Sequence, residues 1–583
     1  NPEGTASSEN ESGNGDGIVV KTGASGTLIG GVAGFSLRGN LISGNNRGIL
    51  VEQYPSETVT TIQSNFIGTD ASGTSAIPNQ IGVEVNLITR DGCSDRYGCV
   101  FVASSDDFLL IGGPLPSEGN LISGNQKQGL LIDSLNWTEQ LSFEFPFGFD
   151  LSDSTRLIQN NIIGLNADQT QALPNAVGAL FRDTSDFVLQ GNTIAGNSLK
   201  DFSGAGIGIP LAGADAETIF LIEGGALAYF TLVDNTIGTN PDGTILTSYN
   251  DAAAISIEGH FHQIGLPGQG NIISGTFAGL ELTEWCRVPC FAAEGGGGLG
   301  ARGRSFASVE SNWIGTNPSG ANLGGEFGII ARHSVHSIGA DASEDDPLVV
   351  AEKGNVIANQ SKAGILVRDM KIEFDPSAAS GYGASSRGNI FTGVPADIPI
   401  LLEVSTPFSF WVFDDGGYDH IDCSGVSCFL PNDVGDSDAG QNKLQNYPEF
   451  DGTVTQFNES TGELEVRYRV DSDPANSDYP LQIDFYLATK QFNGVDIYLG
   501  SDTYLESDAG LFRSVAFPPV DPATEVAGYL RATATDSENF GNTSQMSEQL
   551  ITVPEPGFMP AMIVGGVGLM GLAGRRRVRR QGA

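Results

Sequence analysis

Residues 120–125 read NLISGN, and residues 65–74 read NFIGTDASGT. Both stretches begin with Asn, carry Ile two positions later and continue into a Gly-rich polar turn. The short and the long form alternate along most of the chain. Copies begin at Asn40, Asn65, Asn120, Asn161, Asn192, Asn235, Asn271, Asn312, Asn355 and Asn389. Self-similarity of this kind is typical of stacked repeat proteins, so the repeat predicts the fold class before any local propensity is considered.

Each repeat contains three short apolar runs separated by Gly, Asn, Ser and Asp turns. One repeat has FLLIGG from Phe108, NLISGN from Asn120 and GLLID from Gly129. Three short strands in a repeat of roughly 22–25 residues suit one coil of a parallel β-helix. We therefore predict an all-β protein in which residues 1–392 form a parallel β-helix of about eleven coils, on the order of 50 Å long.

The ten marker asparagines are predicted to be scaffold residues. Asn tolerates left-handed backbone, and its amide can bond the turn above and the turn below, so the stacked side chains would form a ladder. The Ile or Phe two residues after each Asn is expected to point inward. The alternative is that the asparagines bind a ligand.

Composition limits the partners. The chain has 29 Lys and Arg against 70 Asp and Glu, a formal charge of −41 and a pI near 4.2. Nucleic acids and anionic membranes require basic surfaces, so neither is expected as a partner. A row of calcium or sugar contacts is a further hypothesis for the long-form turns, through Asp70, Asp168 and Asp242.

The six cysteines form three close pairs in predicted loops. Local disulfides are favoured over zinc, because no C-x-x-C pair is present and the chain has five His. Disulfides require an oxidising compartment, which predicts export. The pairs are Cys93 with Cys99, Cys286 with Cys290, and Cys423 with Cys428.

The beginning of the sequence resembles the middle of a coil. The chain starts with Asn, no secretory signal precedes the repeats, and NGDGIVV follows from Asn14. Because a terminal coil needs a polar cap, we expect that residues 1–392 are truncated at their N-terminus, with earlier coils and a signal peptide upstream.

The sequence pattern of the repeat resembles that of bacterial secreted right-handed parallel β-helix repeat proteins. The resemblance is carried by LIGGPLPSEGNLISGN from Leu110 and SNFIGTDASGT from Ser64, and it covers roughly residues 14–392. It implies a right-handed helix and a surface location, but no general activity. The inserts here are longer than in the compact family pattern.

A junction and a second β domain follow the repeats. Residues 393–443 are predicted to be a linker with an acidic loop, and residues 444–552 an antiparallel, immunoglobulin-like β-sandwich. The stretch NDVGDSDAGQNKLQNYPEF from Asn432 resembles the junction that follows the helix in those repeat proteins. Its hard oxygen ligands suggest calcium, with a plain Asx-turn linker as the alternative. The candidate ligands are Asp433, Asp436, Asp438 and Asn442.

Residues 553–583 predict the location of the protein. The motif Pro554-Glu555-Pro556 precedes an apolar run and the sequence RRRVRR from Arg575. This arrangement resembles the PEP-CTERM sorting signal of Gram-negative, exopolysaccharide-producing bacteria. The resemblance implies a single transmembrane sorting helix, recognition by an exosortase and transfer to the cell surface, outer membrane or matrix. An ordinary membrane anchor is the alternative.

No catalytic residue set is recognisable, so a non-enzymatic, adhesin-like surface scaffold is the main hypothesis. Its expected partners are exopolysaccharide or cell-surface components. Two alternatives stay open. One is a polysaccharide lyase or glycoside hydrolase, which a cluster of two carboxylates with Arg or Lys would favour. The other is a calcium-stabilised carbohydrate-binding module.

Overall fold

The computed structural model describes the strands of the repeats and most of the second β region. The described residues are 15–21, 24, 26–31, 39–53, 59–87, 93–94, 98–99, 109–134, 156–182, 184, 187–197, 220–223, 230–244, 253–258, 262–283, 306–332, 335–368, 383–394, 398–402, 431–437, 441–452, 456–457, 463–488, 496–518, 529–537 and 541–550.

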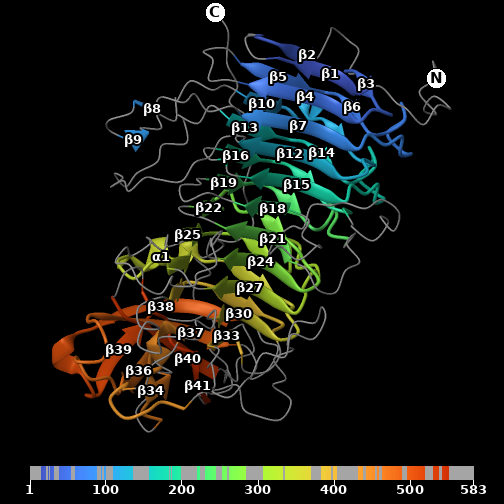
Figure 1. The fold of residues 1–583 in the computed structure, drawn as a ribbon. Helices are drawn as coiled ribbons and strands as arrows, with labels where there is room; N and C mark the ends of the chain where they lie inside the picture. The colour runs from blue at the N-terminus through green and yellow to red at the C-terminus, as the bar shows by residue number, and fades with distance from the viewer. Residues whose placement is uncertain are drawn as a thin grey trace, which may run out of the picture.

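The repeats form three long parallel sheets that the chain visits in rotation (Figure 1). Strand β1 (Asp16–Val20) lies in the first sheet, β2 (Leu28–Gly30) in the second and β3 (Leu41–Ile42) in the third. Strand β4 (Arg47–Gln53) then returns to the first sheet beside β1. This all-β arrangement is consistent with a parallel β-helix.

In each sheet the spatial order of the strands equals their order in the chain. The first sheet continues with β7 (Ile81–Leu87), β12 (Gln128–Ser134), β15 (Val177–Arg182), β18 (Phe220–Glu223), β21 (Ala253–Glu258), β24 (Ala278–Thr283), β27 (Phe327–Arg332), β30 (Ala363–Arg368) and β33 (Ile400–Leu402). The second continues with β5 (Thr60–Gln63), β10 (Leu109–Gly112), β13 (Arg156–Gln159), β16 (Phe187–Gln190), β19 (Phe230–Val233), β22 (His262–Ile264), β25 (Phe306–Val309), β28 (Val335–Gly339) and β31 (Ala384–Arg387). The third continues with β6 (Phe66–Ile67), β11 (Leu121–Ile122), β14 (Ile162–Ile163), β17 (Thr193–Ile194), β20 (Thr236–Ile237), β23 (Ile272–Ile273), β26 (Trp313–Ile314), β29 (Val356–Ala358) and β32 (Ile390–Thr392). The parallel stack therefore extends to Leu402, ten residues past the boundary predicted at residue 392.

Short elements interrupt the circuits. A 3₁₀ turn spans Pro116–Glu118, and helix α1 (Pro347–Lys353) lies between β28 and β29. Strands β8 (Cys93–Ser94) and β9 (Gly98–Cys99) pair as an antiparallel hairpin inside one insert.

The inward side chains form continuous columns. In the third sheet the residue two positions after each marker Asn is at most 5% exposed, which confirms the predicted inward position. Each buried aliphatic side chain of this size contributes about 1.5–3 kcal/mol relative to exposure. Consecutive members of the column are paired in register. They are Ile42, Ile67, Ile122, Ile163, Ile194, Ile237, Ile273, Ile314, Ile357 and Phe391.

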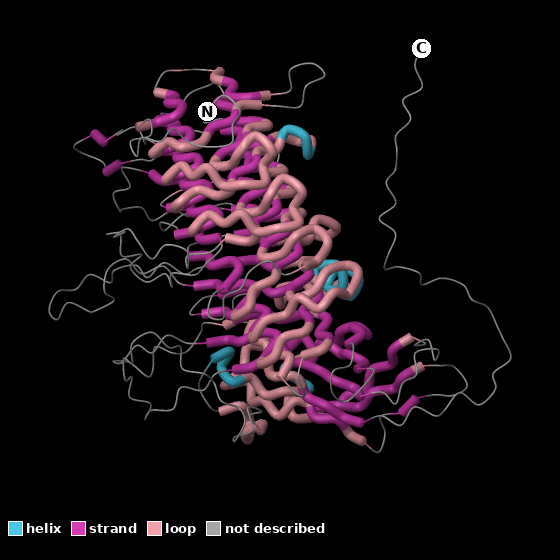
Figure 2. The backbone as a smooth tube through the Cα atoms, turned by 90° about the vertical axis from the view of Figure 1, so that its right-hand side faces the viewer, coloured by secondary structure: helices cyan, strands magenta, loops and turns pink. Residues whose placement is uncertain are grey.

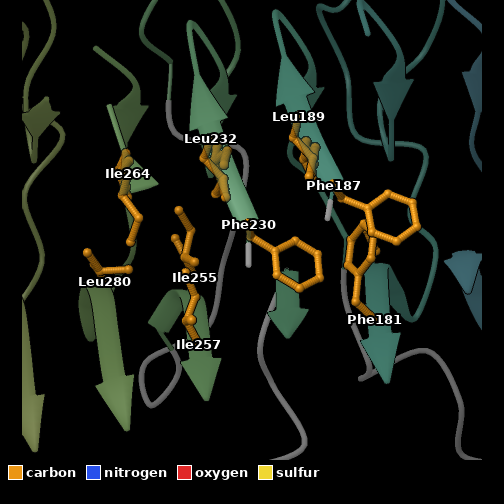
Figure 3. Packing of buried hydrophobic residues seen from close by; sticks show 14 of the residues in the cluster. Phe181, Phe187, Leu189, Phe230, Leu232, Ile255, Ile257, Ile264 and Leu280 are labelled. Atoms are coloured by element: carbon orange, nitrogen blue, oxygen red, sulfur yellow. The ribbon is translucent and has the colours of Figure 1, made fainter. Parts of the chain in front are cut away.

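Aromatic side chains fill the middle of the core (Figure 3). The rings of Phe187 and Phe230 stack at a centroid distance of 5.8 Å, and Phe181 meets both rings edge-on. On the far side of Phe230, the His262 ring lies 5.8 Å away. His262 is therefore buried against an aromatic ring.

The marker asparagines form a hydrogen-bonded ladder where the chain turns from the second sheet to the third. The backbone N–H and the side-chain Nδ2 of each Asn donate to Oδ1 of the next, from Asn40 to Asn389, at 2.9–3.0 Å. From Asn65 onward, Nδ2 also donates to a second-sheet carbonyl of the preceding circuit, as Asn120 does to Ile62 at 2.8 Å. The amides therefore use their polar atoms within the stack.

A second asparagine ladder, which the sequence analysis did not predict, follows the next corner. Asn45, Asn79, Asn125, Asn175 and Asn197 are linked through Nδ2-to-Oδ1 hydrogen bonds of 2.9–3.0 Å. Its sequence signal is the last Asn of N-x-I-S-G-N and the Asn that follows Pro in the long form. Both corners are thus held by stacked amides.

The C-terminal strands, here called the C-terminal module (β34–β41), lie at the end of the stack next to β30 and β33 (Figures 1 and 2). They form two antiparallel sheets that share a core of Tyr468, Phe485, Tyr504, Leu530 and further apolar residues. One sheet contains β34 (Glu449–Phe450), β35 (Gln456–Phe457), β36 (Leu464–Arg469) and β39 (Arg513–Phe517). The other contains β37 (Leu481–Ala488), β38 (Asp496–Tyr504), β40 (Tyr529–Thr535) and β41 (Ser547–Leu550). Two 3₁₀ segments, η5 (Gln441–Leu444) and η6 (Glu506–Asp508), complete the module.

Candidate functional site at the end of the parallel stack

Strand β37 is buried on both faces. All eight of its residues are buried, and Ile483 and Phe485 point into the core of the C-terminal module. Because side chains alternate along a strand, Asp484 and Tyr486 point the other way, toward the parallel stack. Tyr486 belongs to the core of the stack rather than to that of the module.

The three sheet ends are covered together. Strand β38 lies against β32 and α1, and η5 lies against β30 and β33. Met546 joins the core of the stack, and Leu444 and Tyr498 pack against it. The module therefore closes the apolar interior at this end.

A buried ion pair joins β31 to β37. The Arg387 guanidinium donates from Nε to Asp484 Oδ2 and from Nη2 to Asp484 Oδ1, both at 3.0 Å. Nη1 donates to the carbonyl oxygens of Asp341 (2.8 Å) and Glu344 (2.7 Å), and Nη2 also donates to Ser501 Oγ (3.2 Å). Both charged side chains are 0% exposed. The five N–H donors of the guanidinium are thus all used.

The charge on Arg387 is maintained by its partner. Burial acts to lower the pKa of Arg387, but the charge and hydrogen bonds of Asp484 outweigh burial, and the pKa lies above its usual value. Ser501 Oγ donates a further short hydrogen bond to Asp484. A desolvated pair of this kind is costly to break, because removal of one partner leaves a buried charge uncompensated.

The hydroxyl of Tyr486 completes the contact between the stack and the module. The Gly388 N–H donates to Tyr486 Oη at 3.1 Å, directly before the last marker, Asn389. Burial raises the pKa of Tyr486, and the charge of Asp484 raises it further, so this hydroxyl stays neutral.

Of the predicted calcium ligands, Asp433 and Asp436 lie close enough to interact electrostatically, and both contact Asn446. Asn442 Oδ1 accepts the backbone N–H of Ala384 in β31, which places this amide against the stack. Asp433 Oδ2 accepts hydrogen bonds from the N–H and the hydroxyl of Ser437. Asp438 lies outside the described residues. In the part of the chain that the structure describes, no group of three or more His, Cys, Asp and Glu is placed to hold a metal ion.

Asp436 is the centre of the acidic loop. Its Oδ1 accepts from the Asn446 N–H at 2.9 Å, and its Oδ2 accepts from Gln445 Nε2, Ser472 Oγ and Ser477 Oγ at 2.6–3.0 Å. Burial raises its pKa to about 6, against the effect of these hydrogen bonds. Four protein donors therefore contact the carboxylate of Asp436, whereas Asp433 Oδ1 is buried without a hydrogen-bond partner among the described residues. Calcium binding at this loop stays a prediction.

The long-form turns stack along the parallel region. In the first, Asp70 Oδ1 accepts the Thr74 N–H at 3.0 Å, and Asn166, Asn240 and Asn317 occupy the same position in the later turns. Successive turns touch, since Asn240 Nδ2 donates to the carbonyl of Gln169 at 3.0 Å. The carboxylates of Asp168 and Asp242 belong to exposed residues.

One cluster beside α1 combines carboxylates with a lysine. Lys353 Nζ lies 3.8 Å from Glu310 Oε1 and 3.9 Å from Glu344 Oε2. Burial raises the pKa of Glu310, with smaller contributions from the negative charges of Asp341 and Glu344, while Lys353 lowers it. A carboxyl with a raised pKa next to a second carboxylate is the kind of pair that acid–base chemistry uses.

Some predicted sites lie outside the described residues or are described only in part. The backbone of the β8–β9 hairpin pairs Cys93 with Cys99, and the other two cysteine pairs fall outside the described residues. The sorting motif Pro554-Glu555-Pro556 and the whole of residues 553–583 also fall outside them. Within the described ranges, no helix has both the length and the apolar character needed to cross a membrane.

Comparisons with protein-family models, with curated proteins and with solved structures give no match to this chain. The resemblance to the repeat proteins and to the sorting signal therefore rests on the motifs quoted above. Sequence reasoning missed Arg387 and Asp484, which are separated by 97 residues along the chain. One signal was available, since a charged residue inside the apolar run LQIDFYLA needs a buried partner.

Proposed function

We propose that this chain is an exported, non-enzymatic scaffold of the cell surface or exopolysaccharide matrix of a Gram-negative bacterium. Its repeats form a right-handed parallel β-helix that serves as a rigid rod. The observation that carries the proposal is the pair of asparagine ladders, whose amide groups are used for stacking rather than offered to a ligand. A rod held by columns and ladders suits a spacer or an extended interaction surface.

The order of segments along the chain supports the proposed location. The C-terminal module, in our proposal an immunoglobulin-like sandwich, lies between the rod and residues 553–583. The sorting tail would hold the chain in the inner membrane until an exosortase recognises Pro554-Glu555-Pro556 and releases it. The buried Arg387–Asp484 pair gives the rod a firm connection to the part of the chain nearest the tail.

The location is tested with the full chain in an exopolysaccharide-producing Gram-negative host. We expect the protein to reach the surface or matrix without its tail, which the intact mass reports. Replacement of Pro554, Glu555 and Pro556 by Ala, or deletion of the host exosortase, should leave the uncleaved chain in the inner membrane. Surface delivery that is unchanged in both strains would reject the sorting proposal.

The partner is tested by a glycan screen of the full chain with and without calcium. Retention of exopolysaccharide without cleavage would support a matrix-binding rod. Retention that requires calcium would favour the calcium-stabilised carbohydrate-binding module, with the long-form turns as the first region to mutate. If neither glycans nor cells are bound, the adhesin-like part of the proposal fails.

The alternative of a polysaccharide lyase or glycoside hydrolase is favoured by one observation, the cluster of Glu310, Glu344 and Lys353 beside α1. In this alternative, Glu310 would act as the acid because its pKa is raised. Shortened glycan chains in the same screen would support it. The Glu310→Gln variant should then abolish cleavage but keep retention, whereas cleavage that survives the substitution would rule out this cluster.

A further inference from the structure

Among the described residues, β31 is the last parallel strand of the second sheet. Three backbone groups on its outer edge, the Ala384 N–H, the Ala384 carbonyl and the Ser386 N–H, are nevertheless hydrogen-bonded. Asn442 Oδ1 accepts the Ala384 N–H at 2.7 Å, and Asn442 Nδ2 donates to the Ala384 carbonyl at 2.9 Å. The Thr543 N–H donates to the same carbonyl at 3.2 Å, and Thr543 Oγ1 accepts the Ser386 N–H at 2.8 Å. Together these contacts replace the hydrogen bonds of a neighbouring strand.

The two residues are held as one unit. Asn442 Nδ2 also donates to the Thr543 carbonyl at 2.8 Å, and Thr543 Oγ1 lies 2.8 Å from Thr535 Oγ1 in β40. The neighbouring Asn542 donates from its backbone N–H and its Nδ2 to Asp536. Asn442 adopts a left-handed backbone with φ of 48°, which Asn tolerates better than most residues. The side chain that meets Ala384 is therefore positioned from both η5 and β40.

An unprotected edge strand is a hazard for a stacked β protein. Its free N–H and C=O groups are a template for pairing with another chain. Among the described residues, the groups that contact the outer edge of β31 come from η5 and the C-terminal module. The carboxamide of Asn442 presents a donor and an acceptor side by side, as a backbone amide does.

We propose that Asn442 and Thr543 form a surrogate rung that terminates the parallel stack, and that this rung prevents a second copy of the chain from pairing with β31. The inference goes beyond a spacer role for the module. It also assigns Asn442 a structural role different from the calcium ligation predicted from sequence.

The test compares the full chain with the Asn442→Ala and Thr543→Val variants. Hydrogen exchange, followed by mass spectrometry with fragmentation, reports on the amides of Ala384 and Ser386. Light scattering over a concentration series reports on self-association. Because each substitution leaves a buried N–H without its acceptor, we expect exchange to accelerate by about tenfold or more. Asn442→Ala should accelerate exchange mainly at the Ala384 amide, and Thr543→Val mainly at the Ser386 amide. Both variants should also self-associate, to a degree that increases with protein concentration.

The control is Asn161→Ala, which removes a ladder amide in the middle of the stack, where both neighbouring strands remain. It should destabilise the stack without faster exchange confined to β31 and without association. Thr543→Val preserves side-chain shape and the N–H bond to Ala384, so it remains informative if Asn442→Ala does not fold. Unchanged exchange in β31 with a monomeric protein would overturn the proposal, as would equal association of the Asn161→Ala control.

Discussion

Replacement of Arg387 by Met is the sharpest test of how the rod is joined to the C-terminal module. The substitution removes the partner of Asp484, whose side chain is 0% exposed, and leaves the Asp341 and Glu344 carbonyls without their donor. Loss of one member of a buried ion pair typically costs about 3–5 kcal/mol. That cost corresponds to a rise in local opening of roughly two to three and a half orders of magnitude.

The assay is native-state hydrogen exchange of the full chain, read in β31 and β37, because a single unfolding free energy is poorly defined for a repeat protein with a second module. The double variant Arg387→Met/Asp484→Leu removes both charges and should recover most of the lost protection, since an apolar pair can replace a buried ion pair. The reasoning would be refuted if Arg387→Met lowered the free energy of opening by less than about 1 kcal/mol, or if the double variant were as unstable as the single one.

Three further predictions concern the ladder, a corner and the acidic loop. Asn161→Ala should lower the melting temperature of the stack, with a cost of about 2–4 kcal/mol, because its amide serves both neighbouring rungs. Gly112→Ala should prevent normal stacking, since its φ is +91° and a Cβ would lie 1.8 Å from the Gln159 carbonyl oxygen. The matched variant Gly268→Ala, with φ of +80° and nothing within 4 Å, should cost only the left-handed strain of about 1–2 kcal/mol; circular dichroism and thermal melts distinguish the two. For Asp436, the folded pKa of about 6 exceeds the unfolded value near 3.9, so the folded state binds the proton more tightly. Protonation of Asp436 therefore adds nothing to the free energy of unfolding well above pH 6. Its stabilising contribution grows as the pH falls through 6 and is complete below about 4, where it amounts to roughly 3 kcal/mol. Asp436→Asn should remove this part of the pH dependence in exchange measurements on residues 432–446, and an identical pH profile in wild type and variant would contradict it.

The repeat could be predicted from sequence because each circuit depends on its own short motif. Asn120 and Ile122 recur at the same spacing in every copy, so the ladder and the inward column follow from local chemistry repeated along the chain. The ladder through Asn79 was missed because its asparagines are preceded by different residues in the short and the long form. Its regular spacing emerges only after the corners are aligned in three dimensions.

The junction could not be predicted in the same way, because its contacts are made once. Asn442 lies in a stretch whose acidic residues suggest calcium, and only its contacts with Ala384 and Thr543 in the fold indicate a different role. Its partners, Ala384 in β31 and Thr543, are 58 and 101 residues away along the chain. No periodicity identifies a contact between segments that occur a single time, and local spacing of oxygen ligands gives no information about which backbone groups need a partner.

The end of the stack is nevertheless encoded in one column of the second sheet. From Ile29 through Ile338 the inward position is occupied by Ile, Leu or Val, and in β31 the same register position is Ser386. All four residues of β31, Ala384–Arg387, are buried although three of them are polar. Ser385 Oγ donates to the Ala340 carbonyl and Ser386 Oγ accepts from Asn389 Nδ2, so both hydroxyls are bonded within the stack. The guanidinium of Arg387 is instead paired with Asp484 of the C-terminal module. Because a buried guanidinium is stable only with a partner, Arg387 favours the C-terminal module over a further apolar repeat at this end. Ser386→Ile would place a larger side chain at this buried position and remove the hydrogen bond from Asn389 Nδ2, so exchange in β31 should rise more than exchange in β25, two strands away.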